Sequence, residues 1–316
     1  MRILIVIAAV IALGAGATAY ALRAPEEVSV AVEQGPVELS AGRLMFVDEV
    51  SGRVASVPLT DPAGPRRVSS LSCKRFYTAA RQGLCLADRS GPFPGSVAIF
   101  VDQSLTETHR IDVAGVPNRA KLSPDGRMAS WTTFVTGDSY AQTGAFSTRT
   151  GIYDRETLLY QSNMEGTRIA GMKRAEDMNF WGVTFTGDDR SFYATLSTGG
   201  KTYLINGDAV DISAKTVREN AECPSLSPDG RRVAFKKRVS GDGARPWRQH
   251  VLDLTTMVET PLAETRGIDD QVVWLDNDTI AYGLPGEGIW AVQANGEGAP
   301  RQLVPHASSP SLVIPE

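Results

Sequence analysis

Two stretches of the sequence nearly match each other: Leu122-Ser-Pro-Asp-Gly-Arg-Met-Ala-Ser-Trp131 and Leu226-Ser-Pro-Asp-Gly-Arg-Arg-Val-Ala-Phe235. In such a turn, proline presets φ at the second position, aspartate suits the third, and glycine accepts a positive φ. An apolar run follows each turn, so the pattern predicts a tight hairpin between an inner strand and its neighbour. The predicted turn residues are Pro124, Asp125, Gly126, Pro228, Asp229 and Gly230.

Weaker copies of this unit occur elsewhere in the chain. Taken together, the six anchor positions lie 41, 43, 63, 41 and 48 residues apart. They are Gly42, Gly83, Gly126, Asp189, Gly230 and Asp278. Six units with a spacing of about 44 residues are typical of a β-propeller with four strands in each blade. The long third step carries extra residues, for which the candidates are 136–150 and 163–177, the second suited to a short helix.

The end of the chain resembles an inner strand. Ser309–Pro315 is similar to Cys223–Pro228, whereas the unit that begins at Gly42 has no inner strand of its own. We therefore expect residues 310–314 to pair with residues 43–48, which would close the ring and remove an open sheet edge. The predicted fold is all-β: a six-bladed β-propeller whose C-terminal strand closes blade one, preceded by an N-terminal hydrophobic helix.

The N-terminus has the features of an export segment. Met1 and Arg2 precede an uncharged stretch over residues 3–22, long enough to span a bilayer. Ala19-Tyr-Ala21 also fits a signal-peptidase site, so a cleaved signal and a retained anchor both remain open. We predict a signal peptide or transmembrane anchor at 1–23, a linker at 24–40 and the propeller at 41–316. The propeller would be membrane-anchored outside the cytoplasm or, after cleavage, periplasmic or secreted.

Cysteine usage agrees with export. Cys73 and Cys85 lie twelve residues apart on two expected strands joined by a short turn, which predicts a disulfide across a hairpin. Two separate buried thiols are the alternative. Cys223 is left over and is expected to be a buried free thiol.

Charge and motif content exclude several function classes. The net charge is −4, which gives no reason to expect a nucleic acid partner. No glycine-rich loop has the spacing that binds nucleotides, so no cofactor is predicted. No CxxC pair or histidine accompanies Cys73 and Cys85, and the sequence predicts no metal site.

Candidates for catalysis are few, and we predict no catalytic residue. His109, His250 and His306 fall in different blades or loops, and Gly137–Ala141 resembles a nucleophile elbow without the helix that should follow it. Three pairs of carboxylates could bind a hard cation, but capping of the repeat turns is the favoured account. These pairs are Asp188 with Asp189, Asp269 with Asp270, and Asp276 with Asp278.

Two further groups are candidates for binding. Trp181 and Trp274 are expected on inner strands, where they pack between blades unless they reach the mouth of the ring. Lys236, Lys237 and Arg238 form a basic cluster that could meet anionic lipid or a cell-envelope polymer, although a solvated strand face is the simpler account.

The Ser-Pro-Asp-Gly-Arg turns with their apolar strands resemble the repeats of TolB-type propellers, the periplasmic component of the Tol–Pal system. The resemblance covers roughly residues 42–314 and includes Cys223–Gly230 and Trp181–Phe185. It implies a non-enzymatic scaffold that binds proteins of the cell envelope, with membrane contact through residues 3–22 if the N-terminal segment is retained. The alternatives are a small-molecule or glycan-binding sensor and a propeller-fold hydrolase or lactonase.

Overall fold

The computed structural model describes residues 30–89, 95–135, 147–239 and 246–313. Contacts divide the chain into two units, Met1–Ala31 and Val32–Glu316. The predicted signal or anchor at 1–23 and the elbow-like Gly137–Ala141 lie outside the described residues. Across the described ranges, no helix is both long and apolar enough to cross a bilayer.

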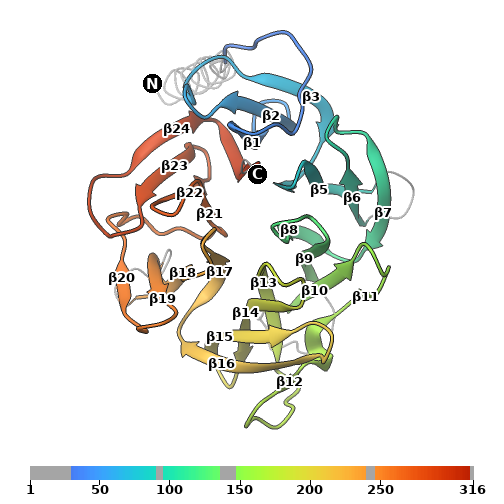
Figure 1. Cartoon of the computed structure of the whole chain (residues 1–316), viewed down its shortest axis with the longest axis vertical. Coiled ribbons are helices and arrows are strands. Elements are labelled where there is room, and N and C mark those ends of the chain that lie inside the picture. Colours follow the sequence, from blue (N-terminus) through green and yellow to red (C-terminus); the bar gives the residue numbers. More distant parts are fainter. Residues whose placement is uncertain (1–29, 90–94, 136–146, 240–245, 314–316) are drawn as a thin grey trace, which may run out of the picture. The chain divides into compact units, whose positions relative to one another are not determined.

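The unit from Val32 onward is built from six sheets placed around one axis, antiparallel except where β12 pairs with β16 (Figure 1). We number them as blades one to six, and each places its innermost strand nearest the axis. From the inside outward, blade one contains β25 (Ala307–Leu312), β1 (Arg43–Asp48), β2 (Arg53–Pro58) and β3 (Arg67–Ser72). Blade two contains β4 (Arg75–Ala79), β5 (Gln82–Asp88), β6 (Ser96–Val101) and β7 (Glu107–Val113). Blade three contains β8 (Val116–Leu122), β9 (Met128–Val135), β10 (Ser147–Asp154) and β11 (Tyr160–Gln161).

The remaining blades follow the same order. Blade four contains β13 (Asn179–Phe185), β14 (Ser191–Thr198), β15 (Lys201–Asp208) and β16 (Ser213–Glu219), with β12 (Arg168–Ile169) added to its outer edge. Blade five contains β17 (Glu222–Leu226), β18 (Arg232–Arg238), β19 (Trp247–Asp253) and β20 (Glu259–Pro261). Blade six contains β21 (Val273–Trp274), β22 (Thr279–Leu284), β23 (Gly288–Gln293) and β24 (Arg301–Pro305). The predicted six-bladed architecture is confirmed.

The core lies between blades rather than inside them. Buried apolar side chains form six clusters, and each joins two neighbouring blades. The middle strands are therefore covered on both faces, and β6 is buried at every position. The outer strand β7 is mostly exposed. This explains why the sequence shows continuous apolar runs in the middle strands instead of strict alternation.

The C-terminal strand closes the ring as predicted. Strand β25 pairs with β1, and Leu44 lies opposite Leu312. Arg66 secures this closure, because its guanidinium binds Asp48 at 2.5 Å and the carbonyl oxygen of Pro305 at 2.8 Å. Arg66 and Asp48 are both buried and form an ion pair within the first blade, which fixes the guanidinium. Its hydrogen bonds to the carbonyls of Pro305 and His306 hold the segment that enters β25, in addition to strand pairing.

Three inner strands share one irregularity. The strands β13, β17 and β25 each contain a register shift, and each has a residue with positive φ beside it. These residues are Gly182, Cys223 and Ser309, with φ of +65°, +51° and +54°. The resemblance between Cys223–Pro228 and the C-terminal segment is thus also a structural equivalence. Such bulges redirect side chains, here close to the ring axis.

The repeat turns form as predicted, and Asp125 shows how the motif works. Its carboxylate accepts hydrogen bonds from the Ser123 hydroxyl at 2.5 Å and the Arg127 amide at 3.0 Å. Gly126 adopts the required positive φ of +79°. The turn at Ser227–Gly230 repeats these contacts through Asp229. In blade four, Asp188 takes the aspartate role and Asp189 occupies the glycine position with φ of +54°.

The predicted disulfide joins Cys73 and Cys85, whose Cα atoms are 5.5 Å apart, and Cys223 is a buried free thiol, as expected. The second insertion candidate, 163–177, contains the 3₁₀ helix η1 (Met164–Gly166) and the short strand β12. Of the first candidate, residues 147–150 belong to strand β10, and the rest lies outside the described residues. Val37 and Leu39, at the end of the predicted linker, pack into the core between blades one and two.

Candidate binding site at the ring axis

Side chains from non-adjacent blades meet at the ring axis. Arg75 of blade two lies 3.5 Å from Asp270, which precedes blade six. Arg119 of blade three bonds to Asp269 at 3.4 Å, again across the ring. Lys121 of blade three donates to the Ser225 hydroxyl of blade five at 3.1 Å. None of these blade pairs are neighbours, so the contacts cross the centre and form one polar network.

Asp269 and Asp270 correct a prediction. They were expected to cap a repeat turn, but they lie in the segment that enters blade six and accept contacts from basic side chains. Asp269 binds Lys236 and Arg119, whereas Asp270 lies between Arg75 and Arg119. The other two pairs behave as expected, since Asp188 and Asp276 each accept hydrogen bonds from turn amides.

The ion pairs hold Asp269 in its charged form. Burial raises the pKa of Asp269, but the attraction of Lys236 and Arg119 outweighs burial and holds the pKa below its usual value. Lys236 is itself buried and has a second carboxylate, Glu222, at 3.5 Å. These groups therefore neutralise one another in the resting protein.

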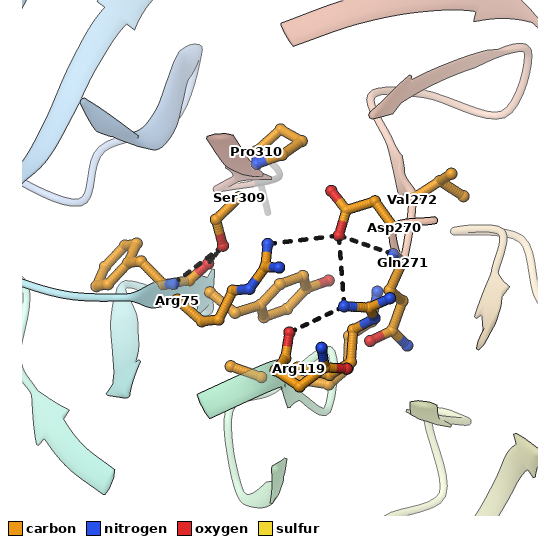
Figure 2. A pocket seen from close by; sticks show the side chains of 12 residues that line it. Arg75, Arg119, Asp270, Gln271, Val272, Ser309 and Pro310 are labelled. Atoms are coloured by element: carbon orange, nitrogen blue, oxygen red, sulfur yellow. Dashed lines mark hydrogen bonds and ion pairs between the residues drawn. The ribbon is translucent and has the colours of Figure 1, made fainter. Parts of the chain in front are cut away.

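Figure 2 shows a small cavity within this network, which we call the axial cavity. Its volume is about 20 Å³, enough for one water-sized particle. Arg75 and Arg119 approach Asp270 from the blade two and blade three sides, while Ser309 bonds to the backbone of Phe76 (Figure 2). The charged side chains that line the cavity are Arg75, Arg119, Lys121 and Asp270.

A much larger cleft opens over blades three to five and has a volume of about 1030 Å³. We call it the blade 3–5 cleft. Its apolar walls include Phe134, Trp181 and Trp247. The charged residues among its lining are Arg119, Lys201, Glu219, Glu222, Lys236, Arg238 and Asp269. Connections between antiparallel strands alternate between the two ends of a sheet, and the Ser-Pro-Asp-Gly turns all lie at one end. Most of the residues that line the cleft lie near the other end of their strands, so the cleft is on the face opposite these turns.

The two predicted tryptophans have different environments. Trp181 lines the blade 3–5 cleft although only 7% of its surface is exposed. Trp274 is buried between blades five and six, where its indole N–H donates to the Ser225 carbonyl at 2.9 Å. The Arg232 guanidinium lies 5.3 Å from the Trp274 ring. Trp274 is therefore a packing residue, while Trp181 remains a candidate for binding.

The predicted basic cluster does not form a single solvated face. Because side chains alternate along β18, Lys236 and Arg238 point to the cleft, and Lys237 points to the other side and pairs with Glu259 at 2.5 Å. Lys236 is buried and lies over the Trp247 ring at 4.3 Å. Arg238 is exposed and lies over the same ring at 5.3 Å. The sequence did not identify Trp247 as a candidate binding residue, because its position after Pro246 at the start of β19 does not indicate that role.

The three histidines lie apart from one another. His109 stacks on Tyr153 with a centroid distance of 5.7 Å, and His250 contacts Glu259 at 2.9 Å. Burial lowers the pKa of His250. His306 lies between β24 and β25, where its carbonyl accepts a hydrogen bond from the Glu49 amide. In the part of the chain that the structure describes, no three His, Cys, Asp or Glu side chains gather as a metal site.

Comparison with solved structures places this architecture among known propellers. TolB from Acinetobacter baumannii matches with a TM-score of 0.61 and 15% identity, over 86% of this chain and 67% of that chain. The fold is TolB-like. No protein-family model and no curated protein sequence matches the chain. At this identity, the likeness to TolB concerns the fold alone.

Enzymes share the TolB-like fold as well. A puromycin-hydrolyzing peptidase from Mycobacterium tuberculosis matches with a TM-score of 0.51 and 16% identity, over 86% of this chain but 45% of its own. An oligogalacturonate lyase in complex with manganese matches with a TM-score of 0.51 and 10% identity, over 82% of this chain and 72% of that chain. The fold is thus compatible with binding proteins and with enzymes, and function has to be argued from the site.

Proposed function

We propose that this TolB-like propeller is an exported, non-enzymatic binding protein that holds a protein partner of the cell envelope in the blade 3–5 cleft. The disulfide between Cys73 and Cys85 is consistent with export, because such bonds persist in oxidising compartments. The observation that carries the proposal is the composition of the cleft. Tryptophan and arginine dominate the energetics of protein interfaces, and here Trp181, Trp247 and Arg238 line one open cleft.

The state of the charged groups also favours binding over catalysis. A general acid or base needs a free group with a pKa near the working pH. Asp269 instead pairs with Lys236 and Arg119, and its pKa lies below the usual value. Groups paired in this way can position a ligand without exchanging protons with it.

Site-specific photocrosslinking tests the proposal. A benzoyl-phenylalanine residue at position 238 should crosslink a protein partner in the native envelope. The same residue at position 210 is the control, because Val210 is exposed in the β15–β16 turn on the opposite face.

The purified partner then provides the quantitative test. Trp247→Ala should weaken its affinity about 30-fold, the loss expected of a hot spot worth about 2 kcal/mol. Leu159→Ala, an exposed change in the β10–β11 turn, should leave affinity unchanged. Adducts that form equally from position 210, or equal affinity of Trp247→Ala and wild type, would refute the cleft as the binding face. Saturable binding of a small molecule or oligosaccharide without a protein partner would instead support the sensor alternative.

A further inference from the structure

The charges around the axial cavity are unbalanced. Three cations, Arg75, Arg119 and Lys121, line it, and Asp270 is the one carboxylate among its lining residues. Asp269 and Glu222 do not correct this imbalance, because they come with one more cation, Lys236. The wider network therefore has four cations against three carboxylates. Buried ions are normally paired, since an unpaired charge away from water is strongly unfavourable.

Arg75 and Arg119 share Asp270. The carboxylate lies 3.5 Å from Arg75 and 3.9 Å from Arg119, both longer than a strong charge-assisted hydrogen bond. Burial lowers the pKa of Arg75, and the like charge of Arg119 lowers it further against the attraction of Asp270. The two guanidinium groups therefore repel each other across the carboxylate that they share.

Lys121 has no carboxylate partner among the described residues. Its side chain is buried, donates to the Ser225 hydroxyl at 3.1 Å, and lies 4.5 Å from the centre of the Tyr77 ring. A second group is also unsatisfied: the Nε of Arg119 is buried and has no acceptor in the described part of the chain. Arg119 is only 6% exposed. Among the described residues, Lys121 is thus a buried cation without a negative partner, and Arg119 keeps one buried N–H without an acceptor although its other nitrogens reach Asp269 and Asp270.

We propose that the axial cavity binds a small monovalent anion of about the size of chloride. A water molecule needs about 10–15 Å³ of such space, so the cavity's 20 Å³ suits one small ion rather than phosphate or sulfate. The anion lies between Arg75, Arg119 and Lys121 and supplies the charge that Asp270 does not. This inference does not depend on the proposed partner or on the blade 3–5 cleft.

The unfolding temperature reports on this site. It is measured in sodium chloride and in sodium gluconate at equal ionic strength. A ligand that binds only the folded state raises the unfolding temperature, here by roughly 2–4 °C at saturating chloride. Lys121→Met should abolish the difference between the two salts. The matched control is Lys201→Met, an exposed lysine paired with Glu219, which should keep the full difference.

Bromide diffraction gives a second readout that does not depend on a variant. Crystals of the wild-type protein grown in sodium bromide should show an anomalous peak in the axial cavity. Equal unfolding temperatures of the wild type in chloride and gluconate, or a cavity without bromide, would overturn the proposal. So would a chloride effect that Lys121→Met retains. Stabilisation by formate but not by chloride would also overturn it, and would assign the cavity to the carboxylate of a larger ligand.

Discussion

Asp189 is the residue whose replacement should most clearly stabilise the protein. It occupies the position of Gly126 and Gly230 in the repeat turn, with φ of +54°, and it lies beside Asp125 of the preceding blade. Burial and the neighbouring Asp125 carboxylate raise the pKa of Asp189 from 3.8 to about 6. Its Oδ1 is buried and has no donor among the described residues, as expected for a carboxyl group that keeps its proton.

The sign of the pH dependence follows from this pKa. Between pH 3.8 and about 6, the folded state binds more protons than the unfolded state, so the free energy of unfolding falls as pH rises. The difference between the unfolded pKa of 3.8 and the folded pKa of about 6 corresponds to about 3 kcal/mol of unfolding free energy, because one pKa unit is worth about 1.4 kcal/mol. Asp189 is only half-buried, and solvent screening reduces the expected effect to about 1 kcal/mol.

Asp189→Asn should therefore stabilise the protein by about 1 kcal/mol at pH 8 and by almost nothing at pH 4. Asp189→Gly removes the charge and also the backbone strain. It should therefore stabilise the protein by roughly 0.5–1 kcal/mol more than Asp189→Asn at both pH values. Urea unfolding at the two pH values measures each change. The control is Asp88→Asn, an exposed carboxylate 3.3 Å from Lys74, expected to change stability by less than about 0.5 kcal/mol. If Asp189→Asn stabilised the protein equally at both pH values, carboxylate repulsion would not be the cause.

Three other changes test the ring itself. Reducing the disulfide, or replacing Cys73 and Cys85 by serine, should lower the free energy of unfolding by about 3 kcal/mol. Denaturant unfolding with and without reductant measures this loss, and an unchanged free energy would mean that the crosslink does not constrain the unfolded chain. Arg66→Met should cost about 3–5 kcal/mol because it leaves Asp48 buried without its partner, and the double variant with Asp48→Asn should recover part of that loss in a mutant cycle. Gly182→Ala should lower the free energy of unfolding by more than about 2 kcal/mol in thermal unfolding, because the new Cβ would lie 2.8 Å from the Cα of Cys223. The control Gly187→Ala has open space around the new Cβ and should cost under about 1 kcal/mol.

The architecture could be predicted because short turn motifs that repeat along the sequence determine it. The Ser-Pro-Asp-Gly turns at 123–126 and 227–230 each make their own hydrogen bonds, so their geometry does not depend on distant residues. The closing strand was recognisable because Ser309-Pro-Ser-Leu312 matches Cys223-Pro-Ser-Leu226, including the bulge with positive φ that both segments form.

The charged centre could not be predicted in the same way. Lys236 and Lys237 are neighbours of one type, yet one is buried against Asp269 and the other pairs with Glu259. The alternation along a strand separates them, but the sequence does not say which face of β18 meets the ring axis. Trp247 has the same difficulty, because its role depends on the adjacent strand end that supplies Lys236 and Arg238.

The role of Asp269 and Asp270 depends on residues that are far away in the sequence. Two consecutive aspartates between strands look like turn residues, and only the ring brings Arg75, Arg119 and Lys236 to them from three other positions. Asp269 then serves the blade 3–5 cleft and Asp270 the axial cavity, while Arg119 contacts both. Because one guanidinium is shared, negative charge placed on either side of Arg119 competes for the same donor. We therefore expect ligands at the two proposed sites to be coupled electrostatically through this side chain, and such coupling is reciprocal by thermodynamic necessity.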